Sequence, residues 1–271
     1  MPIVLEKAHA RAEVIPERGA LVSRFSVGGE DILFLDPATL ADPTKSLRGG
    51  IPVLFPIAGK LPDNRYQVEG RDYEMGRHGF ARHRPWTVVE RGANGLSMEL
   101  ASDADTLAQF PWKFRCTFEV ALDPHRLRLT WTTRNLDSRP LPLHVGFHPY
   151  FFVPDSMKAA ARVETTATRA FNNQTGEQGA FTGLPLTDPE VDLHLLDHSE
   201  PGTVLHRGPD LKPVKLGWSS EFTTLVVWTL GGRDFVCVEP WTALGGALAR
   251  GERLPLIAPG EANTVRFTIE V

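Results

Sequence analysis

Only two cysteines, Cys116 and Cys237, occur among the 271 residues of this chain, and each lies in an apolar, alternating run. Two cysteines are too few for a disulfide framework in a chain of this size. The first residues, MPIVLEKAHARAEV, contain no basic segment followed by a long apolar stretch, so they do not resemble a signal peptide. We therefore expect a cytoplasmic protein.

An excess of charge of one sign is also missing. The chain has 29 Lys and Arg against 33 Asp and Glu, a net charge of -4, and the two signs are interspersed. This balance argues against a nucleic-acid partner. No apolar run approaches the roughly 18 residues that a membrane-spanning helix needs. We expect a small-molecule partner rather than nucleic acid or membrane, and a monomer or homodimer.

Linkers and nucleotide motifs are absent as well. No Gly/Ser or Pro tract and no block of like charges interrupts the pattern, so we expect residues 1–271 to form one domain. No repeat of fixed period is present, which argues against propellers and solenoids. The chain has no GxGxxG or GxxxxGK[ST] motif and no nucleophile elbow, which excludes the commonest nucleotide-binding and acyl-transfer classes.

The pattern that is present has a period of two. KFRCTFEVAL and RLRLTWTT alternate apolar and polar residues on either side of a short DPH turn, which is typical of a hairpin with one wet face. Similar pairs recur along the chain, and no segment sustains an amphipathic helix of three turns. We therefore predict an all-β fold, a large antiparallel β-sandwich, with under about a tenth of the residues in helix against roughly 30–35% for an average globular chain.

Four segments interrupt this alternation with polar side chains: residues 47–62, 76–86, 141–155 and 235–243. In the last of them, Glu239 follows the apolar run Phe235 to Val238 and precedes Pro240. We expect Pro240 to stop the strand there. The glutamate would then lie either at the solvent rim or in a cleft, where partial burial raises a carboxylate pKa toward the range of a general base.

His144 and His148 lie four residues apart in the apolar stretch LPLHVGFHPYFFVPD. They could form a metal clamp, a pair of core histidines or a proton-transfer site. In an extended strand the two would lie about 13 Å apart, too far to share an ion. His144 has apolar neighbours that favour a core position. Pro149 removes a ladder donor and favours an extended conformation at His148, which we expect at a strand end.

Three further residues stand beside glycines or aromatics in apolar segments. His78 lies between Gly76 and Gly79, where backbone could approach a ligand closely, although a surface loop position is also open to it. Arg48 and Arg82 would be costly to bury without compensation, and a polar or anionic partner would supply it.

The motifs RGGIPVLFP…GK, HGFARHRPW, GFHPYFFVP, CVEPWTA and APGE follow one another in this order. Together, over roughly residues 20–271, they resemble the aldose 1-epimerase or galactose mutarotase-like family, near the branches that include hexose-6-phosphate mutarotases. The resemblance implies a large antiparallel β-sandwich, in agreement with the period of two.

The resemblance also implies roles for individual residues. His148 and Glu239 match the family's catalytic histidine and glutamate. Arg48 and His78, and with a looser match Arg82, correspond to substrate-binding positions. The family often supplies an aspartate to the sugar hydroxyls, and its candidates here have no matching motif: Asp188, Asp192, Asp197 and Asp210.

The implied activity is interconversion of the α and β anomers of a hexose or hexose 6-phosphate by acid–base ring opening, without metal or cofactor. Lys60 is a possible third cation, beside Arg48 and Arg82, for a phosphate. Two alternatives remain open at this point. One is a sugar-binding protein of the same fold without turnover, and the other is a metal-dependent β-sandwich isomerase.

Overall fold

Antiparallel strands account for most of the regular structure. The computed structural model describes residues 1–42, 44–252 and 254–271. About 47% of the residues are in strands and 11% in helices. The all-β prediction is confirmed. The helix content lies slightly above the predicted tenth because short 3-10 turns join several of the strands.

One eight-stranded sheet, called here the first sheet, has the order β15-β19-β20-β24-β11-β10-β9-β8. Its members are β15 (Arg162–Val163), β19 (Gly202–His206), β20 (Val214–Trp218), β24 (Ala262–Glu270), β11 (Arg126–Asn135), β10 (Phe114–Asp123), β9 (Gly95–Ala101) and β8 (Thr87–Arg91). The predicted hairpin around the Asp-Pro turn is β10 paired with β11, with Asp123 opposite Arg126.

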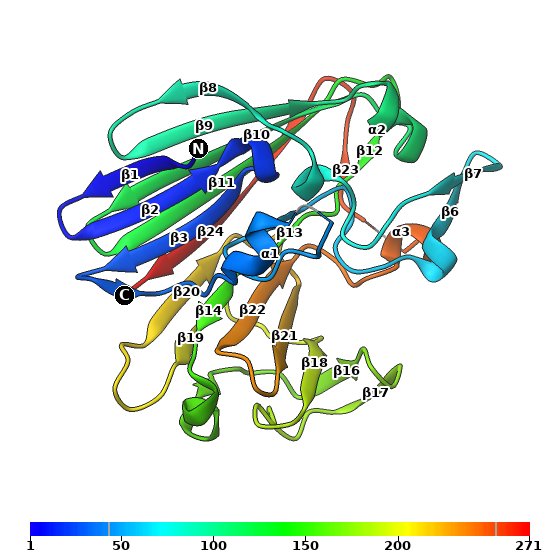
Figure 1. The fold of residues 1–271 in the computed structure, drawn as a ribbon. Coiled ribbons are helices and arrows are strands. Elements are labelled where there is room, and N and C mark those ends of the chain that lie inside the picture. The colour runs from blue at the N-terminus through cyan, green and yellow to red at the C-terminus, as the bar shows by residue number, and fades with distance from the viewer. Residues whose placement is uncertain (43, 253) are drawn as a thin grey trace.

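The second sheet has the order β17-β16-β18-β21-β22-β13-β5, and β14 also pairs with β22. Its members are β17 (Glu177–Ala180), β16 (Arg169–Asn172), β18 (Glu190–Leu195), β21 (Thr224–Leu230), β22 (Phe235–Trp241), β13 (Gly146–Phe147), β5 (Val53–Leu54) and β14 (Tyr150–Phe152). In Figure 1, β21, β18, β16 and β17 lie at the lower right, and β8 to β11 of the first sheet run across the upper half.

Smaller elements complete the structure. A four-stranded sheet consists of β1 (Ile3–Lys7), β2 (Ala10–Ile15), β3 (Leu21–Val27) and β4 (Glu30–Asp31). Two pairs are β6 (Arg65–Val68) with β7 (Arg71–Glu74) and β12 (Leu141–Pro142) with β23 (Leu256–Ile257). The helices are α1 (Pro37–Ala41), α2 (Ala104–Gln109) and α3 (Ala247–Arg250), and the 3-10 turns are η1 (Pro16–Arg18), η2 (Pro62–Asn64), η3 (Ala81–His83) and η4 (Asp155–Ala160).

The two large sheets pack through aromatic side chains. Phe147 of β13 stacks on Phe267 of β24 with ring centroids 5.5 Å apart, and it also contacts Phe118 of β10 at 6.0 Å. Phe55, just after β5, contacts Trp131 of β11 at 5.4 Å. Large buried aromatics contribute strongly to core stability. The second sheet therefore turns one face toward the core and leaves the other face free to form a site.

None of the helices in residues 1–42, 44–252 and 254–271 combines the length and the hydropathy that a membrane-spanning helix needs.

Candidate active site

A cavity of about 770 Å³ lies over the face of the second sheet that points away from the core. Its floor is built from neighbouring strands: Glu239 on β22, Trp228 on β21, and Asp192 and His194 on β18 all line it. Strand pairing explains why they meet. Asp192 is opposite Trp228 and Val226 is opposite Glu239, and directly paired residues point to one face of a sheet.

His148 occupies the interruption between β13 and β14. The strand stops at Phe147 and resumes at Tyr150. The backbone N–H of His148 donates to the carbonyl oxygen of Pro52, and its ring stacks on Tyr150 with centroids 4.7 Å apart. The sequence places the histidine at a strand break for the reason expected, because Pro149 cannot continue the ladder.

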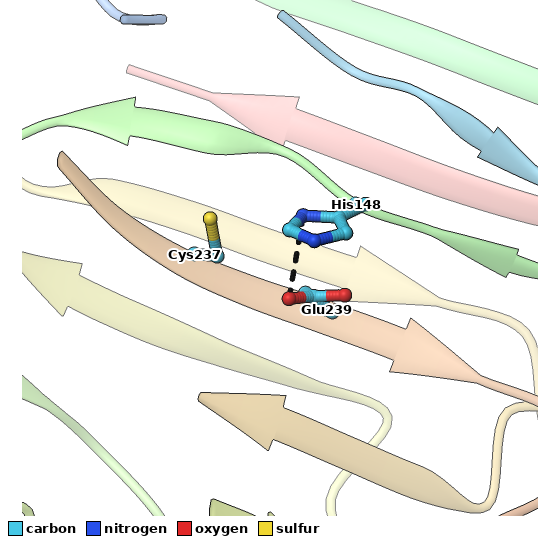
Figure 2. A group of neighbouring side chains, drawn as sticks. All are labelled: His148, Cys237 and Glu239. Atoms are coloured by element: carbon cyan, nitrogen blue, oxygen red, sulfur yellow. Dashed lines mark ion pairs between the residues drawn. The ribbon is translucent and has the colours of Figure 1, made fainter. Parts of the chain in front are cut away.

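Glu239 lies against His148 at the floor of the cavity (Figure 2). Its Oε1 is 3.3 Å from Nδ1 of His148, and its Oε2 accepts a hydrogen bond of 3.1 Å from Nε1 of Trp241. Only 1% of Glu239 and 7% of His148 is exposed. The two side chains therefore form one buried histidine–glutamate pair.

One expectation about this strand is wrong. The strand does not stop at Pro240. β22 continues through Pro240 to Trp241, with Pro240 opposite Leu225. Glu239 consequently sits inside a strand and is almost completely buried, instead of at a strand end. The proline is tolerated there because a strand needs a donor only where a neighbour offers an acceptor.

Burial sets the protonation of this pair. It raises the pKa of Glu239 well above its ordinary value, and the negative charge of Asp192 adds to the rise. Burial lowers the pKa of His148 to about 3, and the Arg82 guanidinium acts in the same direction. Both shifts favour the uncharged forms, a protonated Glu239 and a neutral His148. Near neutral pH the pair is therefore a carboxyl group that can donate a proton beside a neutral imidazole that can accept one.

His78 is held in the cavity wall by a strained backbone. Its φ is 66°, a left-handed conformation that is uncommon outside glycine and typically costs of order 1–3 kcal/mol. Two hydrogen bonds fix it: the N–H of His78 donates to the carbonyl of Gly59, and the N–H of Gly59 donates to Nδ1 of His78. Because Nδ1 is the acceptor, the neutral ring carries its proton on Nε2, which leaves a donor for a ligand.

The position next to His78, Gly79, accepts only glycine. Its φ is 66°, and a Cβ there would lie 2.3 Å from the carbonyl oxygen of Phe55. Only glycine allows this approach. The HGFAR motif thus places His78 against the cavity by packing its turn directly on the end of β5.

Arg48 and Arg82 both line the cavity and are half-buried. The Arg48 guanidinium lies over the Trp228 ring, 4.9 Å from its centroid, a cation–π contact. Nε of Arg82 donates to Nε2 of His83, and burial lowers the pKa of Arg82. The structure therefore brings all five of the predicted site residues to one cavity.

Two exposed cations extend this group. Lys60 and Arg77 also line the cavity. Across residues 1–42, 44–252 and 254–271, none of Arg48, Lys60, Arg77 and Arg82 forms an ion pair with a carboxylate. Arg77 was not singled out in the sequence because its neighbours give no pattern that separates it from a surface arginine.

Among the four aspartates left open by the sequence, only Asp192 lines the cavity. Its Oδ2 accepts a hydrogen bond of 2.7 Å from Asn173. Asp197 instead caps the exposed turn at Thr168. The run EVDLHL carried a signal for this choice, because Asp192 and His194 alternate with apolar residues and so share one face of their strand.

His144 lies apart from the cavity. It is 1% exposed, does not line the cavity, and its Nε2 is 3.1 Å from the carbonyl oxygen of Ala243. Burial lowers its pKa to about 4. This is the arrangement of a core histidine, one of the alternatives that the sequence left open.

Cys237, two residues before Glu239, points to the same side of β22 (Figure 2). Ligand atoms of His148, Cys237 and Glu239 lie within 4.8 Å of one another, and such nitrogen, sulfur and oxygen donors suit zinc. Burial raises the pKa of the Cys237 thiol well above its ordinary value, however, and a metal-bound thiol must lose its proton. The expected absence of a metal stays a prediction, tested below.

Comparison with known proteins agrees with the fold. The aldose 1-epimerase family matches residues 1–256. The Slr1438 protein from Synechocystis sp. PCC 6803 has a TM-score of 0.95 and 34% identity, covering 100% of this chain and 95% of that one. A galactose mutarotase-like protein from Lactobacillus casei ATCC 334 has a TM-score of 0.83 and 22% identity, covering 100% and 99%.

The name of one relative includes a sugar phosphate. The "Putative glucose-6-phosphate 1-epimerase" of Cenchrus ciliaris is 30% identical over 183 residues, which is 63% of this chain and 52% of that protein.

The architecture is that of a galactose mutarotase-like β-sandwich with a buried histidine–glutamate pair. The chain belongs to the aldose 1-epimerase family, and this membership supports an epimerase, hence isomerase, activity on a sugar.

Proposed function

We propose that this protein is an aldose 1-epimerase that interconverts the α and β anomers of a hexose, with His148 and Glu239 as its acid–base pair and residues 1–271 as one catalytic domain. The observation that carries the proposal is the 3.3 Å contact between Nδ1 of His148 and Oε1 of Glu239 at the floor of a polar cavity. General acid–base groups must lie within reach of the protons they move.

The reaction needs one proton removed and one delivered. Ring opening takes the proton from the C1 hydroxyl and gives one to the ring oxygen, as the bond between C1 and the ring oxygen breaks. Rotation about C1–C2 and closure on the other face reverse both transfers. A pair that shares one proton satisfies this balance, because one member accepts while the other donates and the roles exchange on closure. His148 and Glu239 end each cycle with the proton count they began with.

Surrounding groups would orient the sugar. Trp228 and Trp241 supply flat apolar walls in the cavity. Arg48 and the Nε2–H of His78 are donors for hydroxyl oxygens, and the carboxylate of Asp192 is an acceptor for hydroxyl protons. Polar groups that converge beside aromatic walls are typical of small-molecule sites.

Mutarotation itself is the first test. A fresh solution of α-glucose, followed by polarimetry, should approach equilibrium faster with the protein than without it. Replacing Glu239 by Gln should abolish that acceleration. A protein that binds the sugar without changing the rate would be a sugar-binding protein of the same fold, and the proposal of an enzyme would then be wrong.

We further propose that the preferred substrate carries a 6-phosphate. The support is the group of cations without a carboxylate partner, Arg48, Lys60, Arg77 and Arg82, at one cavity. A guanidinium offers a planar fork that matches phosphate oxygens, and such charge-assisted bonds are roughly twice as strong as neutral ones. The name of the Cenchrus ciliaris relative points to the same substrate class.

This finer proposal has its own experiment. The ratio of kcat/KM for glucose 6-phosphate to that for glucose should be ten-fold or more, since one good contact is worth about 1.4 kcal/mol. Arg82→Ala should reduce the ratio while activity on glucose persists. Arg84→Ala is the matched control, because Arg84 pairs with Asp103 and Asp105 and does not line the cavity. Equal efficiencies in the wild type would reject the phosphate.

A further inference from the structure

A second carboxylate–histidine pair lies on the cavity face of the second sheet. Asp192 and His194 are two residues apart on β18, and Nε2 of His194 is 3.4 Å from Oδ1 of Asp192. The other carboxylate oxygen of Asp192 accepts from Asn173. Both members of the pair line the cavity, and the acid–base chemistry proposed above uses neither of them.

The surroundings of His194 leave its ring without another hydrogen-bond partner. Only 3% of the residue is exposed. Its ring packs edge-on against Trp241, with centroids 5.1 Å apart, and against Phe171 at 5.6 Å. Neither ring nitrogen forms a hydrogen bond of good geometry with any described residue. A buried imidazole in such a place is costly unless a polar group completes it.

Strand pairing relates His194 to the acid–base pair. His194 is opposite Val226 and Val226 is opposite Glu239, so all three lie in one row across β18, β21 and β22. Two strand spacings separate His194 from Glu239, about 10 Å between their Cα atoms. His194 and Glu239 therefore point to the same face of the sheet, two strands apart.

Resting on the function proposed above, we propose that His194 is a positioning residue: it holds the Asp192 carboxylate toward one ring hydroxyl of the sugar, and so sets the affinity and hydroxyl specificity of the pocket.

The physical basis is the cost of burying a carboxylate. An ionised Asp192 needs several donors, and Asn173 supplies one. Burial raises the pKa of Asp192, but the close His194 imidazole and the hydrogen bond from Asn173 outweigh that effect. The net shift of the pKa is downward, which keeps the carboxylate charged. A sugar hydroxyl would be the remaining donor. Without His194, the Asp192 carboxylate would be free to rotate. A smaller fraction of the protein molecules would then hold it in the orientation that contacts the sugar hydroxyl.

The test uses two substitutions at one position. His194→Phe keeps an aromatic ring at this position and removes the Nε2–H donor. His194→Gln removes the ring and keeps an N–H near the position of Nε2. Equilibrium binding of glucose, glucose 6-phosphate and their 2-, 3- and 4-deoxy forms is measured by calorimetry, with KM and kcat for the parent sugars. His198→Phe is the control, because His198 bonds to Thr165 and Gly202 and does not line the cavity.

The expected result is specific. His194→Phe should weaken binding of the parent sugar at least ten-fold and raise KM with little change in kcat, because the contact is made equally in ground and transition states. It should weaken binding of one deoxy form by less than about three-fold, because that form lacks the hydroxyl concerned. His194→Gln should bind the parent sugar within about three-fold of the wild type, and the control should bind normally.

Two results would overturn the inference. One is an equal loss for the parent sugar and for every deoxy form, which would mean that the change only damages the pocket. The other is no loss at all. A wild type that binds sugar but does not interconvert anomers would reject the proposed reaction, and the same binding comparison would still decide the role of His194.

Discussion

The two large sheets of this molecule use burial differently. In β10 of the first sheet, buried and more exposed residues alternate, so its polar side chains meet water. In β22 of the second sheet, every residue from Phe235 to Trp241 is buried. One side of β22 packs into the core and the other forms the cavity floor. The comparison teaches that burial on β22 shifts the pKa of a carboxyl group, as at Glu239, whereas an exposed carboxylate on β10 is a charge in contact with water.

The largest expected effect is on the interconversion rate, when the buried pair of Glu239 and His148 is substituted. Glu239→Gln and His148→Asn should each lower the interconversion rate about 10²–10⁴-fold, the usual contribution of a general acid or base. Glu119→Gln, an exposed position on β10, should leave the rate unchanged. The measurement is the enzyme-dependent rate at saturating sugar.

The double variant sharpens the same point. Because both residues act on one proton transfer, the double variant should lose less than the product of the two single losses. Near-normal turnover in either single variant would show that its residue has been misassigned.

The next effect is on stability and lies in the first sheet. Trp131 of β11 is fully buried and contacts Phe55, Phe118 and Trp86. Trp131→Ala should lower the free energy of unfolding by about 3–5 kcal/mol. Glu239→Gln should not destabilise at neutral pH, because it replaces a buried carboxyl group with a neutral one of the same shape. Denaturant unfolding measures both, and a larger loss for Glu239→Gln than for Trp131→Ala would reverse the comparison.

A somewhat smaller effect depends on pH. The pKa of His144 is about 4 in the folded protein, against an ordinary value of 6.5 in the unfolded chain. As pH falls, the unfolded chain therefore takes up a proton at this histidine before the folded protein does. The stability that depends on a neutral His144 is therefore fully present above pH 6.5. As pH falls, the free energy of unfolding decreases, by about 3 kcal/mol at pH 4. His144→Gln should remove that part of the difference in unfolding free energy between pH 7.5 and pH 4. An unchanged difference would show that His144 is not buried as a neutral ring.

The smallest expected effect is that of metal removal. If His148 and Glu239 exchange protons with the sugar, exhaustive treatment with a chelator should change the rate by less than about two-fold. Loss of activity that added zinc restores would mean that the cluster of His148, Cys237 and Glu239 holds a metal. The metal-dependent alternative would then replace the acid–base pair.

Much of the fold could be predicted because alternation is a local signal. The β10–β11 hairpin and the final strand β24 follow directly from it, since each has one wet face. The polar segments around Arg48, His78, His148 and Glu239 stood out because they interrupt apolar runs. Their assembly at one cavity followed only from the family resemblance, because no local pattern sets the distance between segments far apart in the chain.

The remaining features depend on pairing between distant strands. Pro240 looked like the end of a strand, but β22 continues through it because its neighbours, rather than its own propensity, hold it in the sheet. Alternation in EVDLHL places Asp192 and His194 on one face of a strand, but whether that face lines the cavity depends on β18 lying beside β21. His194 was missed for the same reason.

The pH dependence of kcat/KM on a neutral sugar tests the central claim most directly, with a protein-free solution at each pH as the baseline for uncatalysed mutarotation. If burial makes His148 and Glu239 share one proton, the rate should stay level from neutral pH down to about pH 4, because the pKa of His148 is about 3. It should fall on the alkaline side, as Glu239 ionises above its ordinary range. A loss of activity on acidification centred near pH 6.5, the ordinary value for an imidazole, would contradict the account.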